Sequence, residues 1–233
     1  MCTSYTHMNK KTTTPKFAIL ASDVVILTLH QNVLKFLAVR TKSPDFPESW
    51  SLPGGLVKSN ESLDTSARRF FTDFLEVSSD SVHFEQLASF GDPRRDPSGR
   101  VVSVAYLALV PQEAATLKTT PQYQEITWFP LKNLPEMAYD HKEILAAGLK
   151  RLQGKLEYTN IIYSLMPKAF TLTDLQSAYE TILNKSFDKR NFRKKLKALK
   201  LVKKLPKKIA HGAHRPAQLY TFTSTSLQPT QIL

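Results

Sequence analysis

Residues 54–77 read GGLVKSNESLDTSARRFFTDFLEV, and this stretch predicts a tight turn followed by an amphipathic helix. Gly54 and Gly55 follow a proline, and glycine tolerates the positive φ that such a turn often needs. We expect Asn60 to be the N-cap, because asparagine is favoured there and acidic residues follow it in the first turn. Apolar residues then recur at helical spacing, at Leu63, Ala67, Phe70, Phe71 and Phe74.

Three residues of this stretch keep a spacing that resembles the Nudix box. In that motif a Gly is followed by five residues, a Glu, seven residues and an Arg, and Gly55, Glu61 and Arg69 stand in this register. Phe71 and Val77 take the two positions at which the motif has bulky aliphatic residues. An ordinary amphipathic helix would share the periodicity but would not require this register.

The metal-binding part of the motif differs from the family pattern. In active Nudix enzymes, carboxylates after the Arg hold divalent cations against a diphosphate, whereas the corresponding residues here are Phe70, Asp73 and Phe74. The glycine that closes the motif is replaced by Glu76. Mg²⁺ prefers octahedral coordination by oxygen, which phenylalanine cannot supply. The resemblance therefore implies a Nudix fold that binds metal poorly and turns over slowly or not at all.

The composition indicates a soluble protein of one or two domains. The chain has 233 residues, of which 42% are hydrophobic, and Cys2 is its single cysteine. A lone cysteine excludes an intramolecular disulfide and favours a reducing compartment. The longest apolar run, Val101–Val110, has ten residues and is too short to cross a bilayer. Because the N-terminus lacks the apolar segment of a signal peptide, we expect a cytoplasmic protein without membrane contact.

The net charge is concentrated at one end of the chain. Residues 1–150 contain 16 basic and 16 acidic residues, so they are neutral overall. Residues 151–233 contain 16 basic and 4 acidic residues, which accounts for the whole net charge of +12. Charge that served only solubility would be spread over the surface. Its concentration in the last third predicts a polyanionic partner.

Strand and helix signals alternate in the neutral part of the chain. Strands are expected at 17–29, 33–40, 84–90, 101–110 and 127–130, and a helix capped by Asp140 is expected at 140–152. Strands interleaved with helices predict an α/β sandwich, with a mixed sheet between helices.

Residues that could bind a nucleotide lie around the box and in two later segments. Arginine suits a diphosphate, although a solvated surface loop is the alternative for Arg94 and Arg95. Arg69 is expected to pair with Glu61 as a structural strut, and His141 is more simply a helix-start residue. The candidate effector-binding residues are Arg40, Trp50, Gly55, Glu61, Arg69, Asp73, Arg94, Arg95, Asp96, Tyr139 and His141.

The basic third of the chain predicts three helices and a hairpin. A first helix is expected at 158–165, and Thr171 with Asp174 forms a capping-box pattern for a second. Asp188 caps a third helix, 189–200, and two strands at 201–205 and 219–222 flank a basic tip. This order is the plan of a winged helix-turn-helix, whose third helix enters the major groove.

Asn and Arg are suited to base edges, and Lys to phosphates. A merely solvated helix face is the alternative, but the charge asymmetry and the helix spacing favour binding to double-stranded DNA. The candidate DNA-binding residues are Thr171, Thr173, Lys189, Arg190, Asn191, Arg193, Lys194, Lys197, Lys203, Lys204, His214 and Arg215.

Taken together, the chain resembles the Nudix-related transcriptional regulators of NAD metabolism. The resemblance also rests on GDPRRDPSGRVVSVAYLAL (91–109), YDHKEIL (139–145), FTLTDLQSAYETILNKSFDKRNFRKKL (170–196) and RPAQLYTF (215–222). It implies an N-terminal arm at 1–15, a Nudix-like effector domain at 16–153, a winged helix-turn-helix at 154–225 and a tail at 226–233.

The function that the resemblance implies is that of a homodimeric repressor. It would bind a palindromic operator of NAD-synthesis genes, require no cofactor, and release DNA when ADP-ribose or a related metabolite occupies the old catalytic cleft. The alternatives are an active ADP-ribose pyrophosphatase with an appended nucleic-acid-binding domain, a sugar-responsive regulator of the same architecture, and an RNA-binding protein.

Overall fold

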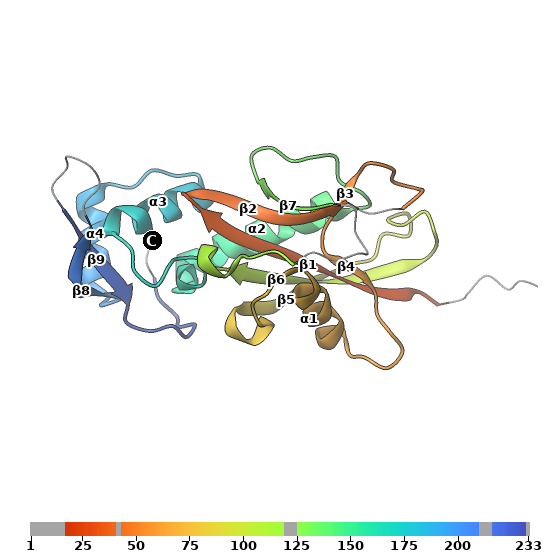
Figure 1. Cartoon of the computed structure of the whole chain (residues 1–233), viewed down its shortest axis with the longest axis horizontal. Helices are drawn as coiled ribbons and strands as arrows, with labels where there is room; N and C mark the ends of the chain where they lie inside the picture. Colours follow the sequence, from red (N-terminus) through yellow and green to blue (C-terminus); the bar gives the residue numbers. More distant parts are fainter. Residues whose placement is uncertain (1–16, 41–42, 119–124, 210–215, 232–233) are drawn as a thin grey trace, which may run out of the picture.

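The structure is a computed structural model that describes residues 17–40, 43–118, 125–209 and 216–231. It contains a helix-covered sheet in the N-terminal part and a smaller C-terminal domain at one end of that sheet (Figure 1).

The sheet is mixed and has seven strands. Its main path runs β3-β2-β1-β6-β5, while β4 pairs with β1 and β7 pairs with β2. β1 and β6 are parallel, and the other pairs are antiparallel. The strands are β1 (Ile19–His30), β2 (Val33–Arg40), β3 (Trp50–Ser51), β4 (Gly54–Leu56), β5 (His83–Phe90), β6 (Val101–Val110) and β7 (Glu125–Pro130). The near-continuous apolar runs of β1 and β6 suit strands that are covered on both faces.

Two long helices cover the two faces of the sheet. α1 (Leu63–Phe74) buries Phe71 and Phe74 against one face, and α2 (His141–Tyr158) buries Ile144 and Leu152 against the other. The predicted α/β sandwich is confirmed. The predicted cap at Asn60 is wrong, because the N-cap of α1 is Ser62, whose hydroxyl accepts the Thr65 N–H at 3.1 Å.

The C-terminal domain has the predicted winged helix plan. It consists of α3 (Leu172–Leu183), α4 (Lys189–Ala198) and the hairpin of β8 (Val202–Ile209) with β9 (Ala217–Phe222). Asp188 is the N-cap of α4, as predicted. Three short 3-10 helices complete the fold, at Ser79–Ser81, Gln112–Ala114 and Ile161–Ser164.

The prediction of a separate first helix at 158–165 is wrong. α2 continues to Tyr158, and only the 3-10 turn follows it. The predicted domain boundary between residues 153 and 154 therefore falls inside α2. The reason is packing: one apolar core runs from Leu27 in the sheet through Leu152 and Leu156 of α2 to Leu175 and Phe192. In the described part of the chain, no helix combines the length and apolar character needed to cross a membrane.

A partly buried carboxylate, that of Glu85, joins β5 to α2. Burial on its own would raise the pKa of Glu85, but His83, whose Nε2 lies 3.6 Å from Oε2, and the hydrogen-bonded ammonium of Lys155 lower this pKa from 4.5 to about 2. We expect Glu85→Gln to lower the free energy of unfolding by about 1–3 kcal/mol at pH 7, because a charged hydrogen-bond acceptor is lost. A depressed carboxyl pKa stabilises the fold above pH 4.5, so the difference from wild type shrinks as the pH falls towards 2. Urea denaturation at pH 7 and pH 3 measures both effects, and the exposed Glu157→Gln on α2 is the control. A loss that stays constant with pH would contradict this role.

Candidate functional site

A polar pocket of about 290 Å³ opens where β1, the turn before β4 and the start of α2 meet. It is lined by Ala21, Asp23, Ser51, Leu52, Gly54, Gly55, Leu56, Arg95, Asp96, Ser98, Val101, Tyr139 and His141. Five of the predicted effector-binding residues line it, namely Gly55, Arg95, Asp96, Tyr139 and His141. Their contact with an effector stays a prediction.

Arg95 is the central cation of this pocket. It is buried, and its guanidinium donates to both carboxylate oxygens of Asp140, at 2.8 Å from Nε and 2.6 Å from Nη2. Nη2 also lies 3.5 Å from Oδ2 of Asp23, a carboxylate that accepts the Ser103 hydroxyl at 2.5 Å. Arg95 therefore points inward from a loop whose other residues are mostly exposed, and it holds two carboxylates in place.

His141 is the first residue of α2 and is buried against Asp23. Its Nδ1 accepts the Leu52 N–H at 2.9 Å, so the proton of the neutral ring lies on Nε2, which faces Oδ1 of Asp23 at 3.6 Å. Burial lowers the pKa of His141, and the neighbouring Asp23 opposes this shift. The neutral imidazole thus links the turn before β4 to β1. Asp140 occupies the N-cap position but makes no capping bond, because Arg95 takes its carboxylate.

The predicted turn ends at Pro53, because Gly54 and Gly55 already belong to β4 and pair with β1, and close packing requires glycine at both positions. A Cβ on Gly54 would lie 2.0 Å from Asp23 Oδ1 and 2.7 Å from the Ser22 carbonyl oxygen. A Cβ on Gly55 would lie 2.9 Å from the ring of Phe70. The start of β4 therefore lies directly between the pocket carboxylate and the aromatic face of α1.

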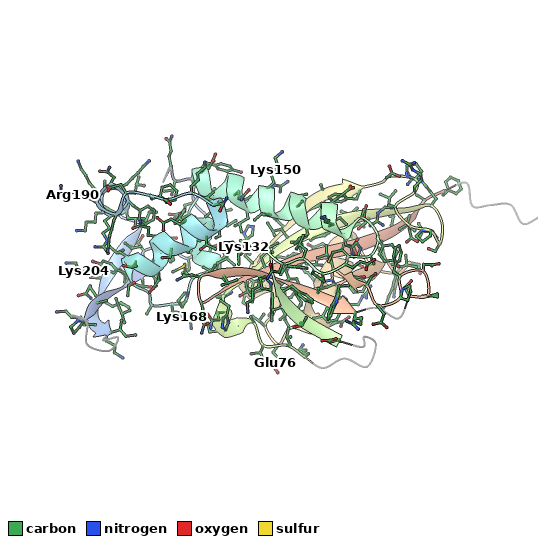
Figure 2. All side chains as sticks on the ribbon, turned by 90° about the horizontal axis from the view of Figure 1, so that it is seen from above. Glu76, Lys132, Lys150, Lys168, Arg190 and Lys204 are labelled. Carbon is green, nitrogen blue, oxygen red and sulfur yellow. The ribbon has the colours of Figure 1, made fainter. Side chains whose placement is uncertain are left out.

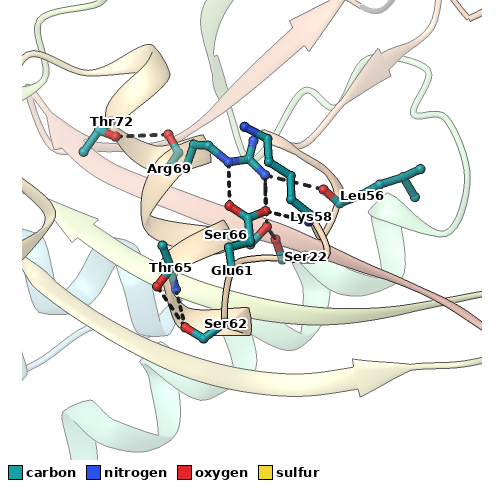
Figure 3. A network of polar contacts seen from close by, with 9 residues as sticks. All are labelled: Ser22, Leu56, Lys58, Glu61, Ser62, Thr65, Ser66, Arg69 and Thr72. Atoms are coloured by element: carbon teal, nitrogen blue, oxygen red, sulfur yellow. Dashed lines mark hydrogen bonds and ion pairs between the residues drawn. The ribbon is translucent and has the colours of Figure 1, made fainter.

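Glu61 in the loop before α1 and Arg69 on α1 form the strut that the sequence predicted. The Arg69 guanidinium donates to both Glu61 oxygens, at 3.0 and 2.5 Å (Figure 3). Glu61 also accepts the Lys58 N–H at 2.8 Å. The hydrogen bond from Arg69 is the largest cause that lowers the pKa of Glu61 to about 2. Glu61 thus folds back over the loop before α1.

The residues of this face do not fit a divalent cation. Both oxygens of Glu61 are engaged by Arg69, while Phe70 and Phe74 are buried and offer no oxygen. The Arg69 guanidinium lies 4.2 Å from the centroid of the Phe70 ring. Among the described residues, no group of three or more His, Cys, Asp or Glu side chains could hold a metal ion. Asp73 alone keeps a carboxylate at a former ligand position.

The remaining predicted effector residues lie outside the polar pocket. Arg40 pairs with Glu48 at 2.7 Å, and its guanidinium lies 4.9 Å from the Trp50 ring centroid. Arg94 is almost fully exposed and lines a second cavity of about 620 Å³, which Arg95 and Tyr139 also line. Tyr139 has a left-handed φ of 55° and its ring lies 4.4 Å from that of Phe46.

The sequence did not predict a role at the site for Asp23 or Ser103, and it did not predict Asp140 as an ion-pair partner. A usable signal for Asp23 exists, because a lone carboxylate interrupts the apolar run of β1. Buried charges are paired, so such a residue indicates a partner elsewhere in the chain. The identity of that partner depends on tertiary structure, since Arg95 and Asp140 are distant in sequence.

The basic face of the C-terminal domain is carried by α4 and β8. On α4, Phe192 and Leu196 are buried in the core, and the charged residues surround this narrow apolar seam. Figure 2 shows Arg190 and Lys204 at the same end of the molecule. The predicted DNA-binding residues of α4 and β8 that are exposed are Lys189, Arg190, Asn191, Lys194, Lys197, Lys203 and Lys204.

Other predicted DNA-binding residues have structural partners. Thr171 is buried as the N-cap of α3, where it forms a complete capping box with Asp174. Arg193 is half-buried and donates to the exposed Thr173 at 3.2 Å, which ties α4 to the start of α3. His214 and Arg215 lie outside the described residues. DNA contact by any of these residues stays a prediction.

Two families match the sequence. The NUDIX domain matches residues 20–148, and the NrtR DNA-binding winged helix domain matches residues 162–222. A protein of Acinetobacter baylyi, named ADPR responsive transcriptional repressor NtrR, is 34% identical to this chain over 88% of this chain and 82% of its own length.

Solved structures agree with these matches. Shewanella oneidensis NrtR in complex with a 27mer DNA has a TM-score of 0.75 and 29% identity, covering 88% of this chain and 93% of that one. The NUDIX domain of the same protein in complex with ADP ribose has a TM-score of 0.53 and 29% identity, covering 63% of this chain and 94% of that one. The chain therefore belongs to the NUDIX family, within the group whose members carry a C-terminal NrtR DNA-binding winged helix domain.

Proposed function

We propose that this chain is a transcriptional repressor that binds operator DNA through its winged helix domain and releases it when ADP-ribose enters the polar pocket. The observation that carries this proposal is the exposed basic face of α4, a helix whose buried side chains are Phe192 and Leu196. Lysine and arginine around so narrow an apolar seam suit a duplex groove.

The relatives support both ligands of the proposal. The Acinetobacter baylyi relative is named as responsive to ADPR, and the Shewanella oneidensis relative was crystallised with DNA and, as its NUDIX domain, with ADP ribose. The corresponding effector in this chain would contact Arg95, Asp96 and Gly54–Gly55 at the start of β4. As the resemblance implies, we further propose that the chain acts as a homodimer on a palindromic operator of NAD-synthesis genes, since a two-fold site matches a two-fold protein.

Loss of hydrolysis suits this role, because a sensor that destroys its signal reports it poorly. Phe70 and Phe74 replace the carboxylates that a diphosphate-bound cation would need, so we infer that the chain is not an enzyme and needs no metal for DNA binding. Incubation of ADP-ribose with the protein and Mg²⁺ or Mn²⁺ tests this inference. Turnover at enzymatic rates of about 1–10³ per second would favour the pyrophosphatase alternative instead.

The central test is duplex binding at fixed salt, with and without ADP-ribose. The duplex is selected from a random library by its binding to the wild-type chain, so the operator sequence need not be known beforehand. A ligand can shift the equilibrium only by its differential affinity for the DNA-competent arrangement. We expect saturating ADP-ribose to weaken duplex binding by about 5–150-fold. An unchanged affinity would remove ADP-ribose as the effector.

Side chains that read bases and side chains that bind phosphate should behave differently. We expect Asn191→Ala or Arg193→Ala to weaken binding to the selected duplex by about 1–3 kcal/mol and to relax sequence preference. Lys203→Ala should weaken all duplexes alike and lower the salt dependence. Affinities for the selected duplex and for a scrambled duplex distinguish the two classes. If the two classes of variant changed affinity and sequence preference alike, an element other than α4 would occupy the groove.

A further inference from the structure

Two hydrogen bonds join the N-terminal domain to neighbouring residues in the last turn of α3. The Thr181 hydroxyl donates to the carbonyl oxygen of Asn32 at 3.1 Å, and the side-chain amide of Gln153 donates to the carbonyl oxygen of Ile182 at 2.8 Å. The last carbonyls of a helix lack partners within the helix, so Ile182 can accept this bond at no cost to α3. The β1–β2 hairpin and α2 thus both hold the last turn of α3.

The β1–β2 hairpin and α2, which both contact α3, also both contribute residues to the polar pocket. Asn32 lies in the turn of the β1–β2 hairpin, and Asp23 of the pocket lies on β1. Gln153 lies on α2, whose first residue is His141. The two elements also touch midway: a Cβ on Gly148 would lie 2.8 Å from Cγ1 of Val25, so α2 lies directly on β1.

α3 in turn holds α4. The side chain of Gln176 donates to the Phe187 carbonyl oxygen at 2.9 Å, and Glu180 accepts the Phe187 N–H at 2.9 Å, which anchors the turn between the two helices. The rings of Tyr179 and Phe192 meet edge to face at 5.5 Å. A rotation of α3 relative to the sheet would therefore carry the basic face of α4 with it.

The surroundings of the two bonds permit such a rotation. Beside Asn32 and Thr181 lies an open, polar cavity of about 440 Å³, which Lys132, Ser177 and Lys185 also line. Apolar contacts between α2 and the C-terminal domain are non-directional, whereas hydrogen bonds have fixed geometry. The two bonds are therefore the features of this contact that set the register of α3.

We propose that Gln153 and Thr181 are positioning residues, through which the occupancy of the polar pocket sets the orientation of the DNA-reading helix. This inference rests on the proposed function, because it names the contact through which ADP-ribose acts on DNA binding. Neither side chain lines the polar pocket or lies on α4, so neither needs to touch ADP-ribose or DNA.

The experiment uses the full chain with the double substitution Gln153→Met and Thr181→Val, which removes both donors and nearly keeps the side-chain volumes. Three quantities are measured: the Kd for ADP-ribose by calorimetry, and the Kd for the selected duplex with and without saturating ADP-ribose. The control is Gln112→Met with Thr116→Val, two exposed residues whose side chains make no hydrogen bond within the described residues.

We expect the double variant to bind ADP-ribose within about two-fold of wild type, because the pocket is intact, while the effect of ADP-ribose on duplex affinity falls from about 5–150-fold towards none. The control should keep the wild-type effect. A full wild-type effect in the double variant would overturn the inference while leaving the proposed function intact. A wild type that binds duplex but ignores ADP-ribose would instead overturn the proposed function, and the inference with it.

Hydrogen exchange provides a second readout if the double variant no longer binds duplex. In the wild type, ADP-ribose should change the exchange of the amides in the last turn of α3, and in the double variant this change should be absent. Exchange at residues 180–184 that is the same with and without ADP-ribose in the wild type would contradict the positioning role.

Discussion

Arg95→Ala lowers the free energy of unfolding by about 3–5 kcal/mol, because it leaves Asp23 and Asp140 without the guanidinium that they share. All three side chains are nearly inaccessible to solvent, with 3% of Arg95, 5% of Asp23 and 12% of Asp140 exposed. Removal of one partner from such a cluster lowers the free energy of unfolding by more than the whole cluster contributes to it, because the remaining charges stay buried without their partner. Urea denaturation monitored by tryptophan fluorescence measures the loss.

The neighbouring arginine provides a matched control. The Arg94 side chain is 92% exposed, so Arg94→Ala should change the free energy of unfolding by no more than about 0.5 kcal/mol. Arg95→Lys keeps the charge but not the two-pronged contact with Asp140, and an intermediate loss is expected. Arg95 also lowers the pKa of His141, so in Arg95→Ala this pKa rises, and the deficit relative to wild type narrows as falling pH protonates His141 of the variant. Equal losses in the Arg94 and Arg95 variants would contradict the buried cluster.

Features fixed by short stretches of sequence were predictable. The capping box of Thr171 and Asp174 and the N-cap Asp188 depend on residues no more than three apart, and both are present in the structure. The pairing of Glu61 with Arg69 also follows from the register of the box, and it is confirmed. Such local signals placed α3, α4 and the order of the hairpin strands, whereas the helix predicted at 158–165 is absent.

Features that depend on distant parts of the chain were not predictable. The partners of Arg95 are separated from it by 72 and 45 positions, and no local pattern relates them. The cap of α1 was missed for another reason: Asn60 satisfies the composition rule, but so does Ser62, which caps the helix by accepting the Thr65 N–H. The continuation of α2 through the predicted boundary follows from a core that both domains share.

The charge asymmetry leads to the prediction with the largest expected change in duplex affinity. Residues 151–233 carry 16 basic and 4 acidic residues, and α4 and β8 expose most of the lysines. A protein that neutralises 6–10 phosphates loses about 10³–10⁵-fold in duplex affinity between 50 and 200 mM salt, because counterions are released from the DNA. We expect a loss of this size for wild type, measured by fluorescence anisotropy without ADP-ribose.

Neutralising two residues of this face should reduce that salt dependence. If Lys194 and Lys197 each contact one phosphate, Lys194→Gln with Lys197→Gln lowers the slope of log affinity against log salt by about 1.8, at about 0.9 per contact. The control removes the same charge elsewhere: Lys142→Gln with Lys150→Gln acts on two exposed residues of α2, and Figure 2 shows Lys150 on the helix that covers the sheet. General electrostatic attraction to a protein of net charge +12 would flatten both slopes equally, whereas a groove-bound α4 flattens only the first.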